Sequence, residues 1–175
     1  MNDWFYDDVA FVCINNLFKG VSETLFSPSS PMSRGMMVTV LHRLTGLPNT
    51  SGSNPFTDVP NDEYYTDAVI WASQLGMVNG VGDNRFAPDD SISRQDLATI
   101  LARYSEAMNI TLPNIVEILN FHDSADISGY AKTAVSAMQR AGVINGKPDE
   151  IFDPLGNATR AEVAAMLHRF IIAAL

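Results

Sequence analysis

Apolar residues recur at helical spacing in three separate segments of the chain. In each segment they occupy positions i, i+3, i+4 and i+7, which is typical of a helix with one buried face. The positions are Met37, Val40, Leu41 and Leu44; Leu97, Ile100, Leu101 and Tyr104; and Val163, Met166, Leu167 and Phe170. A helix-capping residue precedes each stripe, namely Ser33, Ser93 or Thr159. Glu162 supplies the second half of a capping box at the third of these helix starts.

A shorter helix is predicted ahead of each of these long ones. The short helices begin near an aromatic residue, and these residues are Trp4, Tyr64 and Tyr130. They end where a residue suited to a left-handed backbone stands, and these residues are Asn16, Gly76 and Gly142. The connector ITLPNIVEILN is rich in apolar residues, which predicts that it packs against the rest of the protein.

The three helical segments are copies of one repeated unit. Arg34, Arg94 and Arg160 occupy the same place in each copy and are separated by 60 and then 66 positions. The same offsets relate Gly20, Gly80 and Gly146; Phe26, Phe86 and Phe152; and Pro28, Pro88 and Pro154. The copies span about 1–47 (copy one), 55–109 (copy two) and 120–175 (copy three). Helical pairs this short are unstable alone, so we expect one pseudo-symmetric, all-α domain over 1–175 with a shared core.

Charge and composition exclude several classes of partner. Twenty acidic residues against eleven basic ones give a formal net charge of -9, which opposes binding to nucleic acid or to an anionic membrane surface. No apolar stretch has the length of a membrane span, and no targeting segment is evident. The single cysteine, Cys13, lies in an apolar run and is interpreted as a buried thiol. No cofactor or metal site is predicted.

The repeated arginines Arg34, Arg94 and Arg160 are the first candidates for ligand binding. Each follows its helix cap directly, where a cation is mildly unfavourable, so a compensating anion is expected. That anion is either a ligand carboxylate or phosphate, held with the help of free backbone amides, or a nearby acid such as Asp89, Asp90 or Asp153. The two readings remain open from the residues alone.

Other repeated residues also carry alternative interpretations. The rings of Trp4, Tyr64 and Tyr130 either stack on a sugar at a groove edge or pack in the core. The glycines Gly20, Gly80, Gly82 and Gly146 either admit a ligand to the backbone or form turns. Asp58 and Asp123 either bond a sugar hydroxyl, cap the first helix of their copy or pair with an arginine. Arg43, Arg103 and Arg169 lie nine residues after the first arginines, on roughly the opposite helix face, and are interpreted as solvated or bridging charges.

These residues also resemble a known family over essentially the whole chain. The segments FTDVPNDEYYTDAVIWASQLGMVNGVGDNRFAPDDSISRQD and FHDSADISGYAKTAVSAMQRAGVINGKPDEIFDPLGNATRAE look like S-layer homology motifs. They contain Phe-x-Asp, a Gly-ΦΦ-x-Gly turn, in which Φ is apolar, Phe-x-Pro and the closing Thr-Arg-Ala-Glu or its variant. Copy one lacks Phe-x-Asp and reads Ser-Arg-Gly-Met at the closing motif.

The resemblance implies three tandem motifs around a central helical bundle, with ligand grooves between neighbours. It implies a non-catalytic module on the bacterial cell surface, in the wall or S-layer, that belongs to a larger secreted protein. The implied ligand is a secondary cell-wall polysaccharide that often ends in pyruvylated N-acetylmannosamine. By position, the family's carboxylate-binding arginine corresponds to Arg34, Arg94 and Arg160.

Two other classes of function are weighed against anchoring. Asp89 and Asp90 could belong to a carbohydrate-active enzyme, but two catalytic acids must face each other across a sugar. The loop GDNRFAPDD could belong to a calcium-dependent interaction module, but it lacks the ligand spacing of an EF-hand. His42 and His168 share one slot in copies one and three and are interpreted as helix-surface or interface residues.

Overall fold

The protein folds into six α-helices, as the computed structural model shows for residues 3–175. The helices are α1 (Tyr6–Ile14), α2 (Arg34–Leu44), α3 (Thr66–Gln74), α4 (Arg94–Ala107), α5 (Lys132–Arg140) and α6 (Arg160–Ala173), with 3-10 turns at Ser124–Asp126 and Pro148–Glu150. Within residues 3–175 there are isolated β-bridges but no strand, which confirms the all-α prediction. The first two residues of predicted copy one lie outside the described part.

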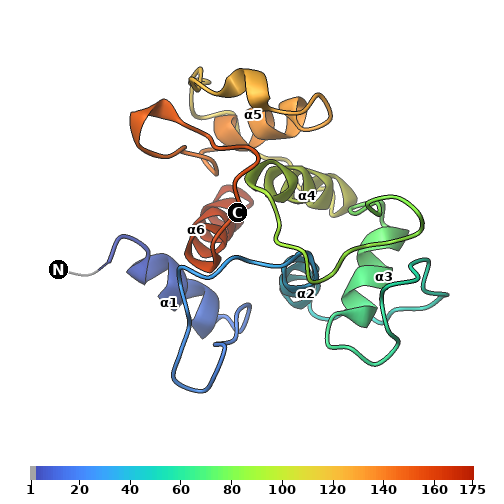
Figure 1. The fold of residues 1–175 in the computed structure, drawn as a ribbon. Helices are drawn as coiled ribbons and strands as arrows, with labels where there is room; N and C mark the ends of the chain where they lie inside the picture. Colours follow the sequence, from blue (N-terminus) through green and yellow to red (C-terminus); the bar gives the residue numbers. More distant parts are fainter. Residues whose placement is uncertain (1–2) are drawn as a thin grey trace.

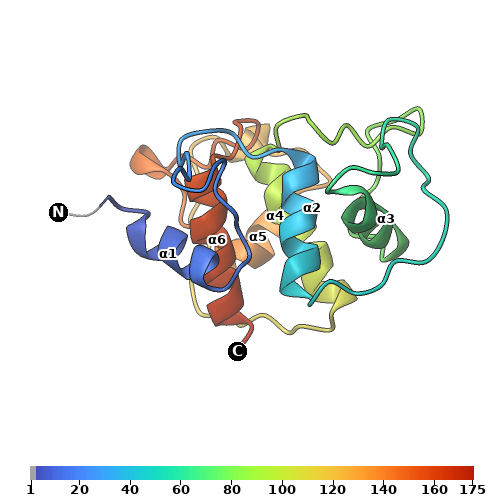
Figure 2. The same ribbon diagram turned by 90° about the horizontal axis from the view of Figure 1, so that it is seen from below.

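The second helix of each copy lies at the centre of the molecule. Figure 1 shows α2, α4 and α6 gathered around one point, and Figure 2 shows them running side by side. The predicted caps start all three helices, because the side chains of Ser33, Ser93 and Thr159 accept a hydrogen bond from the backbone amide three residues on. The capping box of Thr159 and Glu162 is also formed.

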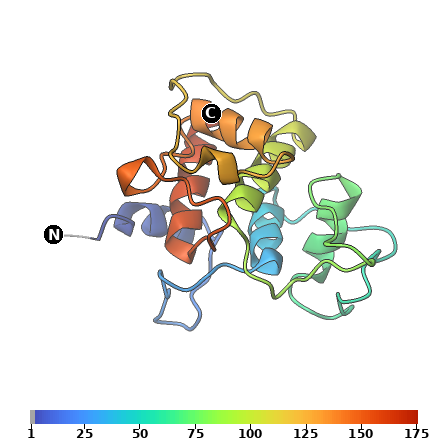
Figure 3. The ribbon, with the colours of Figure 1, turned by 45° about the horizontal axis from the view of Figure 1, so that its top comes forward.

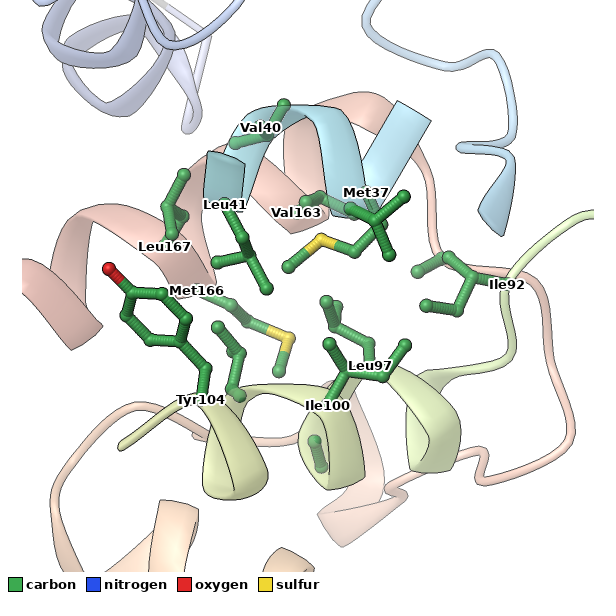
Figure 4. Close-up of a cluster of buried hydrophobic side chains, with 14 of the residues drawn as sticks. Met37, Val40, Leu41, Ile92, Leu97, Ile100, Tyr104, Val163, Met166 and Leu167 are labelled. Atoms are coloured by element: carbon green, nitrogen blue, oxygen red, sulfur yellow. The ribbon is translucent and has the colours of Figure 1, made fainter. Parts of the chain in front are cut away.

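Side chains from the three central helices form one shared core. Figure 4 shows Leu41 of α2, Leu97 of α4 and Leu167 of α6 converging, and none of the three is exposed to solvent. The buried apolar residues of all three copies belong to the same cluster. The predicted stripes therefore face this core, although Leu44 at the end of α2 is only partly buried.

The first helix of each copy packs on the long helix of the preceding copy. Helix α3 lies against α2, α5 against α4, and α1 against α6 (Figures 1 and 3). The short helices begin two residues later than predicted. Each ends two residues before the predicted left-handed residue, which is Asn16, Gly76 or Gly142. The contact of α1 with α6 closes the ring of copies. It includes a 2.7 Å bond between Asp8 and His168.

Three backbone hydrogen bonds join the copies in a closed triangle just before the central helices. The amide of Met32 donates to the carbonyl of Ala158 (2.9 Å), that of Ala158 to Ile92 (2.9 Å), and that of Ile92 to Met32 (2.8 Å). All three residues are fully buried, so these bonds satisfy amides and carbonyls that water does not reach. Each copy supplies one donor and one acceptor.

The apolar connector between copies two and three packs only in part. Ile110 and Leu112 contact the core, as expected. Ile115 and Ile118, however, are 71% and 41% exposed, so the packing prediction is wrong for this half of the connector. Backbone hydrogen bonds hold this half of the connector in place, since the amides of Ile115 and Val116 both donate to the carbonyl of Arg140.

Candidate functional site

The repeated arginines tie each copy to the next one in the ring. Each Nε donates to the backbone carbonyl of a phenylalanine in the neighbouring copy: Arg34 to Phe86 (2.9 Å), Arg94 to Phe152 (2.7 Å) and Arg160 to Phe26 (2.8 Å). Each guanidinium also lies over the ring of that phenylalanine, at 4.8, 5.5 and 4.6 Å from its centroid. The arginines therefore hold the fold together, whatever else they bind.

Two acids predicted as possible ligand contacts hold the Phe-x-Pro loops. The carboxylate of Asp58 accepts from the amides of Phe86 (2.7 Å) and Ala87 (2.8 Å). Asp123 accepts from the corresponding amides in copy three. Burial acts to raise the pKa of the Asp58 carboxyl, but these amides and the nearby Arg85 guanidinium outweigh it and lower the pKa below its ordinary value. The capping prediction is wrong for both acids, because α3 and α5 start without any side-chain cap hydrogen bond. Asp58 does make the alternative ion pair, since Nε of Arg85 lies 3.5 Å from its carboxylate.

The repeated glycines are required by tight hairpins in the loops before the central helices. A Cβ on Gly20 would lie 2.3 Å from the carbonyl oxygen of Ser22, and one on Gly80 would lie 2.4 Å from that of Arg85. Gly146 has a φ of +75° and its Cβ would meet the ring of Phe121 at 2.6 Å. Gly82 lies in the turn of the hairpin in copy two and does not line the grooves described next.

Three grooves of matching construction surround the central helices. Each is lined by an arginine of one copy, by the hairpin and long helix of the next copy, and by the exposed aromatic residue of the third. Groove A contains Arg160, Lys19, Gly20, Met36, Arg43 and Tyr64 and has a volume of about 200 Å³. Groove B contains Arg34, Gly80, Asp96, Arg103 and Tyr130, with about 320 Å³. Groove C contains Arg94, Gly146, Lys147, Glu162, Arg169 and Trp4, with about 450 Å³.

The aromatic residues stand at the edges of these grooves. Trp4, Tyr64 and Tyr130 are 64%, 58% and 57% exposed, whereas the adjacent Tyr65 is buried. Of the two readings open from the sequence, packing in the core is therefore wrong. Tyr130 donates from its hydroxyl to Asp96 at 2.7 Å. Burial, together with this hydrogen bond and the negative charge of Asp96, raises the pKa of Tyr130 to about 12.

A second arginine lines every groove, which the sequence interpretation missed. Arg43, Arg103 and Arg169 do lie across the helix from the first set, but the opposite side of each central helix faces another groove. Each helix thus presents one arginine to each of two grooves, and each groove receives two arginines from different helices. The nine-residue spacing places the two arginines of each helix on opposite faces. That both faces border a groove follows only from the arrangement of the copies in a ring.

The two histidines that share one slot lie at two separate contacts between helices, His42 beside Trp71 of α3 and His168 beside Phe11 of α1. His42 bonds the carbonyl of Pro48 at 2.9 Å, and His168 stacks on Phe11 in the contact of α1 with α6. Both are interface residues, as interpreted from the sequence. Across residues 3–175 no three His, Cys, Asp or Glu side chains gather closely enough to hold a metal ion. In the same range no helix has the length and apolar character needed to cross a bilayer.

A family model described as the S-layer homology domain matches residues 55–98 and 120–164, which together make up just over half of the chain. The chain belongs to the S-layer homology domain family. The two matched segments lie in copies two and three, so two S-layer homology motifs are established. Copy one has the same helices and the same arginine contact, without a match of its own.

Relatives of this S-layer homology module are larger surface proteins and enzymes. The chain is 29% identical to an exoglucanase, XynX, of Acetivibrio thermocellus over 95% of its own length and 15% of the relative's. It is 29% identical to an amylopullulanase of Thermoanaerobacterium thermosulfurigenes, again over 95% of its own length but only 9% of the relative's. An S-layer protein of Bacillus licheniformis is 26% identical over 69% of the chain and 13% of the relative. These matches and the family assign the chain to the cell surface or cell wall.

Proposed function

We propose that this chain is a non-catalytic anchoring module that binds an anionic cell-wall polysaccharide and so attaches a larger surface protein to the wall. The polysaccharide class proposed is a secondary cell-wall polymer that bears a carboxylate, as the pyruvate ketal of pyruvylated N-acetylmannosamine does. Copy one serves as a third S-layer homology motif in this proposal. The module is stable as one unit because its three copies share one core.

The observation that carries the proposal is the repeated content of the grooves. Each contains two arginines and an exposed aromatic ring. An aromatic face stacks on the apolar face of a sugar ring, while guanidinium groups form charge-assisted hydrogen bonds to a carboxylate. The combination of both in one groove suits an acidic sugar better than a neutral sugar or a free anion.

The overall negative charge does not prevent such binding. Repulsion from the net charge of -9 is screened beyond about 8 Å at physiological salt, so the arginines inside a groove dominate locally. Several grooves on one module would also add avidity on a wall that presents many chain ends. The relatives are consistent with an attachment role. Proteins named as glycan-degrading enzymes and proteins named as S-layer components share this segment. Three of these enzymes match nearly the whole chain, and the matched segment makes up at most 17% of each enzyme.

The test is calorimetric binding of the chain to wall polysaccharide purified from its host bacterium. The informative variant replaces Arg43, Arg103 and Arg169 together by alanine, because this removes one arginine from each groove without breaking the contacts to phenylalanine. We expect the variant to bind at least tenfold more weakly, the effect of one lost charge-assisted hydrogen bond. Arg140→Ala is the charge control, since Arg140 is exposed and lies outside the three grooves.

Either of two results would count against the proposal. One is that the parent chain does not bind the polysaccharide. The other is that the triple variant, shown by circular dichroism to be folded, binds as tightly as the parent chain and the Arg140→Ala control.

A further inference from the structure

We propose that the three grooves are not equivalent and that the anionic group of the ligand binds most tightly in groove A. This inference rests on the proposed function and deepens it, because it ranks the grooves by their affinity for the charged group. It also gives the leading role to copy one, whose closing motif departs most from the family pattern.

The grooves differ in the acidic residue that the long helix supplies three positions after its cap. In groove C this residue is Glu162, whose carboxylate lies 2.8 Å from Nη1 of Arg94. In groove B it is Asp96, which accepts hydrogen bonds from the hydroxyls of Tyr130 and Ser93. Both grooves therefore already contain a carboxylate of the protein, and this carboxylate would repel or displace one from a ligand.

Groove A has a methionine at the corresponding place. Met36 lies in the groove with Arg160, Arg43 and Lys19, and no acidic side chain of residues 3–175 lines it. Within the same range no carboxylate lies within salt-bridge distance of Arg160 or Lys19. In groove C, by contrast, Lys147 is held by Asp153 at 2.6 Å. Groove A thus combines three cationic side chains and lacks the protein carboxylate that lines each of the other two grooves.

The guanidinium of Arg160 also has a nitrogen available for a ligand. Its Nε donates to the carbonyl of Phe26, and its Nη2 donates to that of Lys19 at 2.7 Å. Nη1 has no hydrogen-bond partner in the described chain. Every fully buried side-chain nitrogen in that part of the chain does have a partner, so Nη1 must be at least partly accessible to solvent. The corresponding atom of Arg94 is the one that Glu162 occupies. A carboxylate bound in groove A would take the place that Glu162 fills in groove C.

The pKa shifts of the three repeated arginines agree with this difference between the grooves. Burial lowers the pKa of all three arginines. Carboxylates oppose the effect for Arg94, where Glu162 acts most strongly, and for Arg34, where Asp96 does. No carboxylate opposes it for Arg160. A buried cation without a counter-charge gains most from binding an anion.

The test transplants the acid from the other copies into groove A. Arg160 itself is unsuitable for substitution because it holds the fold, so Met36→Glu is the informative variant. It places a carboxylate where Glu162 stands in copy three, and Ser33 is present to complete a capping box. The matched controls are Asp96→Asn and Glu162→Gln, which remove the acid from grooves B and C. The probes are the methyl glycoside of pyruvylated N-acetylmannosamine and its uncharged methyl ester.

We expect Met36→Glu to bind the charged probe about tenfold more weakly than the parent chain. The uncharged ester should bind the parent chain and Met36→Glu equally. Asp96→Asn and Glu162→Gln should bind the charged probe at least as tightly as the parent. Unchanged binding by folded Met36→Glu, with the parent chain binding normally, would overturn this inference alone. A parent chain that binds neither probe nor wall polysaccharide would overturn the anchoring function, and this inference with it.

Discussion

Replacing Arg160 by lysine tests the contact that joins copy three to copy one. Arginine bonds two carbonyls from two different nitrogens, Nε to Phe26 and Nη2 to Lys19, while lying 4.6 Å from the Phe26 ring centroid. Lysine keeps the charge but has one nitrogen at the end of a flexible stem, so it can replace one of these bonds at most. A hydrogen bond from a charged group contributes about 1.5–3 kcal/mol, and a cation–π contact adds about 0.5–1 kcal/mol. We therefore expect Arg160→Lys to lower the free energy of unfolding by about 2–3 kcal/mol.

Urea unfolding followed by far-ultraviolet circular dichroism measures this loss. A domain of this kind has a total stability of about 5–15 kcal/mol, so the midpoint should shift clearly. Arg34→Lys provides an internal comparison. The second bond of Arg34, to the carbonyl of Asn79, is 3.5 Å long, so less is lost. The reasoning is refuted if Arg160→Lys unfolds within about 0.5 kcal/mol of the parent chain, the usual range for a surface substitution, or if Arg34→Lys is the more damaging of the two.

Three further outcomes follow from individual side chains. Asp58→Asn should lower the stability at neutral pH. The difference from the parent should begin to shrink in urea titrations below about pH 4 and vanish only once the pH is below the folded pKa, because a carboxyl with a lowered pKa stabilises the fold above its unfolded pKa and loses that effect as the pH falls through the folded value. Asp96→Asn should bring the pKa of Tyr130 down from about 12, which the ultraviolet absorbance of tyrosinate reports; an unchanged titration would mean that Asp96 does not act on this hydroxyl. Glu162→Ala should cost about 2 kcal/mol in thermal unfolding, since it removes half of a capping box and a bond to Arg94, whereas Glu162→Gln should lose less because it keeps the cap.

Local sequence patterns determined the helices and their ends. The stripe that includes Leu97 and Leu101 predicted a buried face, and both residues are fully buried. Ser93 and Thr159 marked helix starts, and Gly76 marked a helix end with a φ of +68°. These features depend on residues within one or two turns of each other, so a single copy contains all the information needed to predict them.

The arrangement of the copies could not be predicted in the same way. The apolar faces of the three short helices are alike, so nothing local decides whether α3 packs on α2 or on α4. The composition of the grooves depends on that choice. Arg43 was interpreted as a solvated or bridging charge because it lies on the helix face opposite Arg34. The fold instead places it in one groove with Arg160 of another copy, where its Nη1 donates to the carbonyl of Leu17 at 3.0 Å. Ile115 shows the opposite error, since an apolar residue in a connector need not find a surface to cover it.

The backbone triangle at Met32, Ile92 and Ala158 fixes how many copies the module can contain. Each copy gives one amide and receives one at this point, and the triangle has no free position. Loss of one copy would leave a buried donor and a buried acceptor unpaired, and a fourth copy would find no place to bond. This module therefore differs from a solenoid, which can lengthen by one repeat at a time. Gene duplication or deletion should preserve such modules only in complete sets of three.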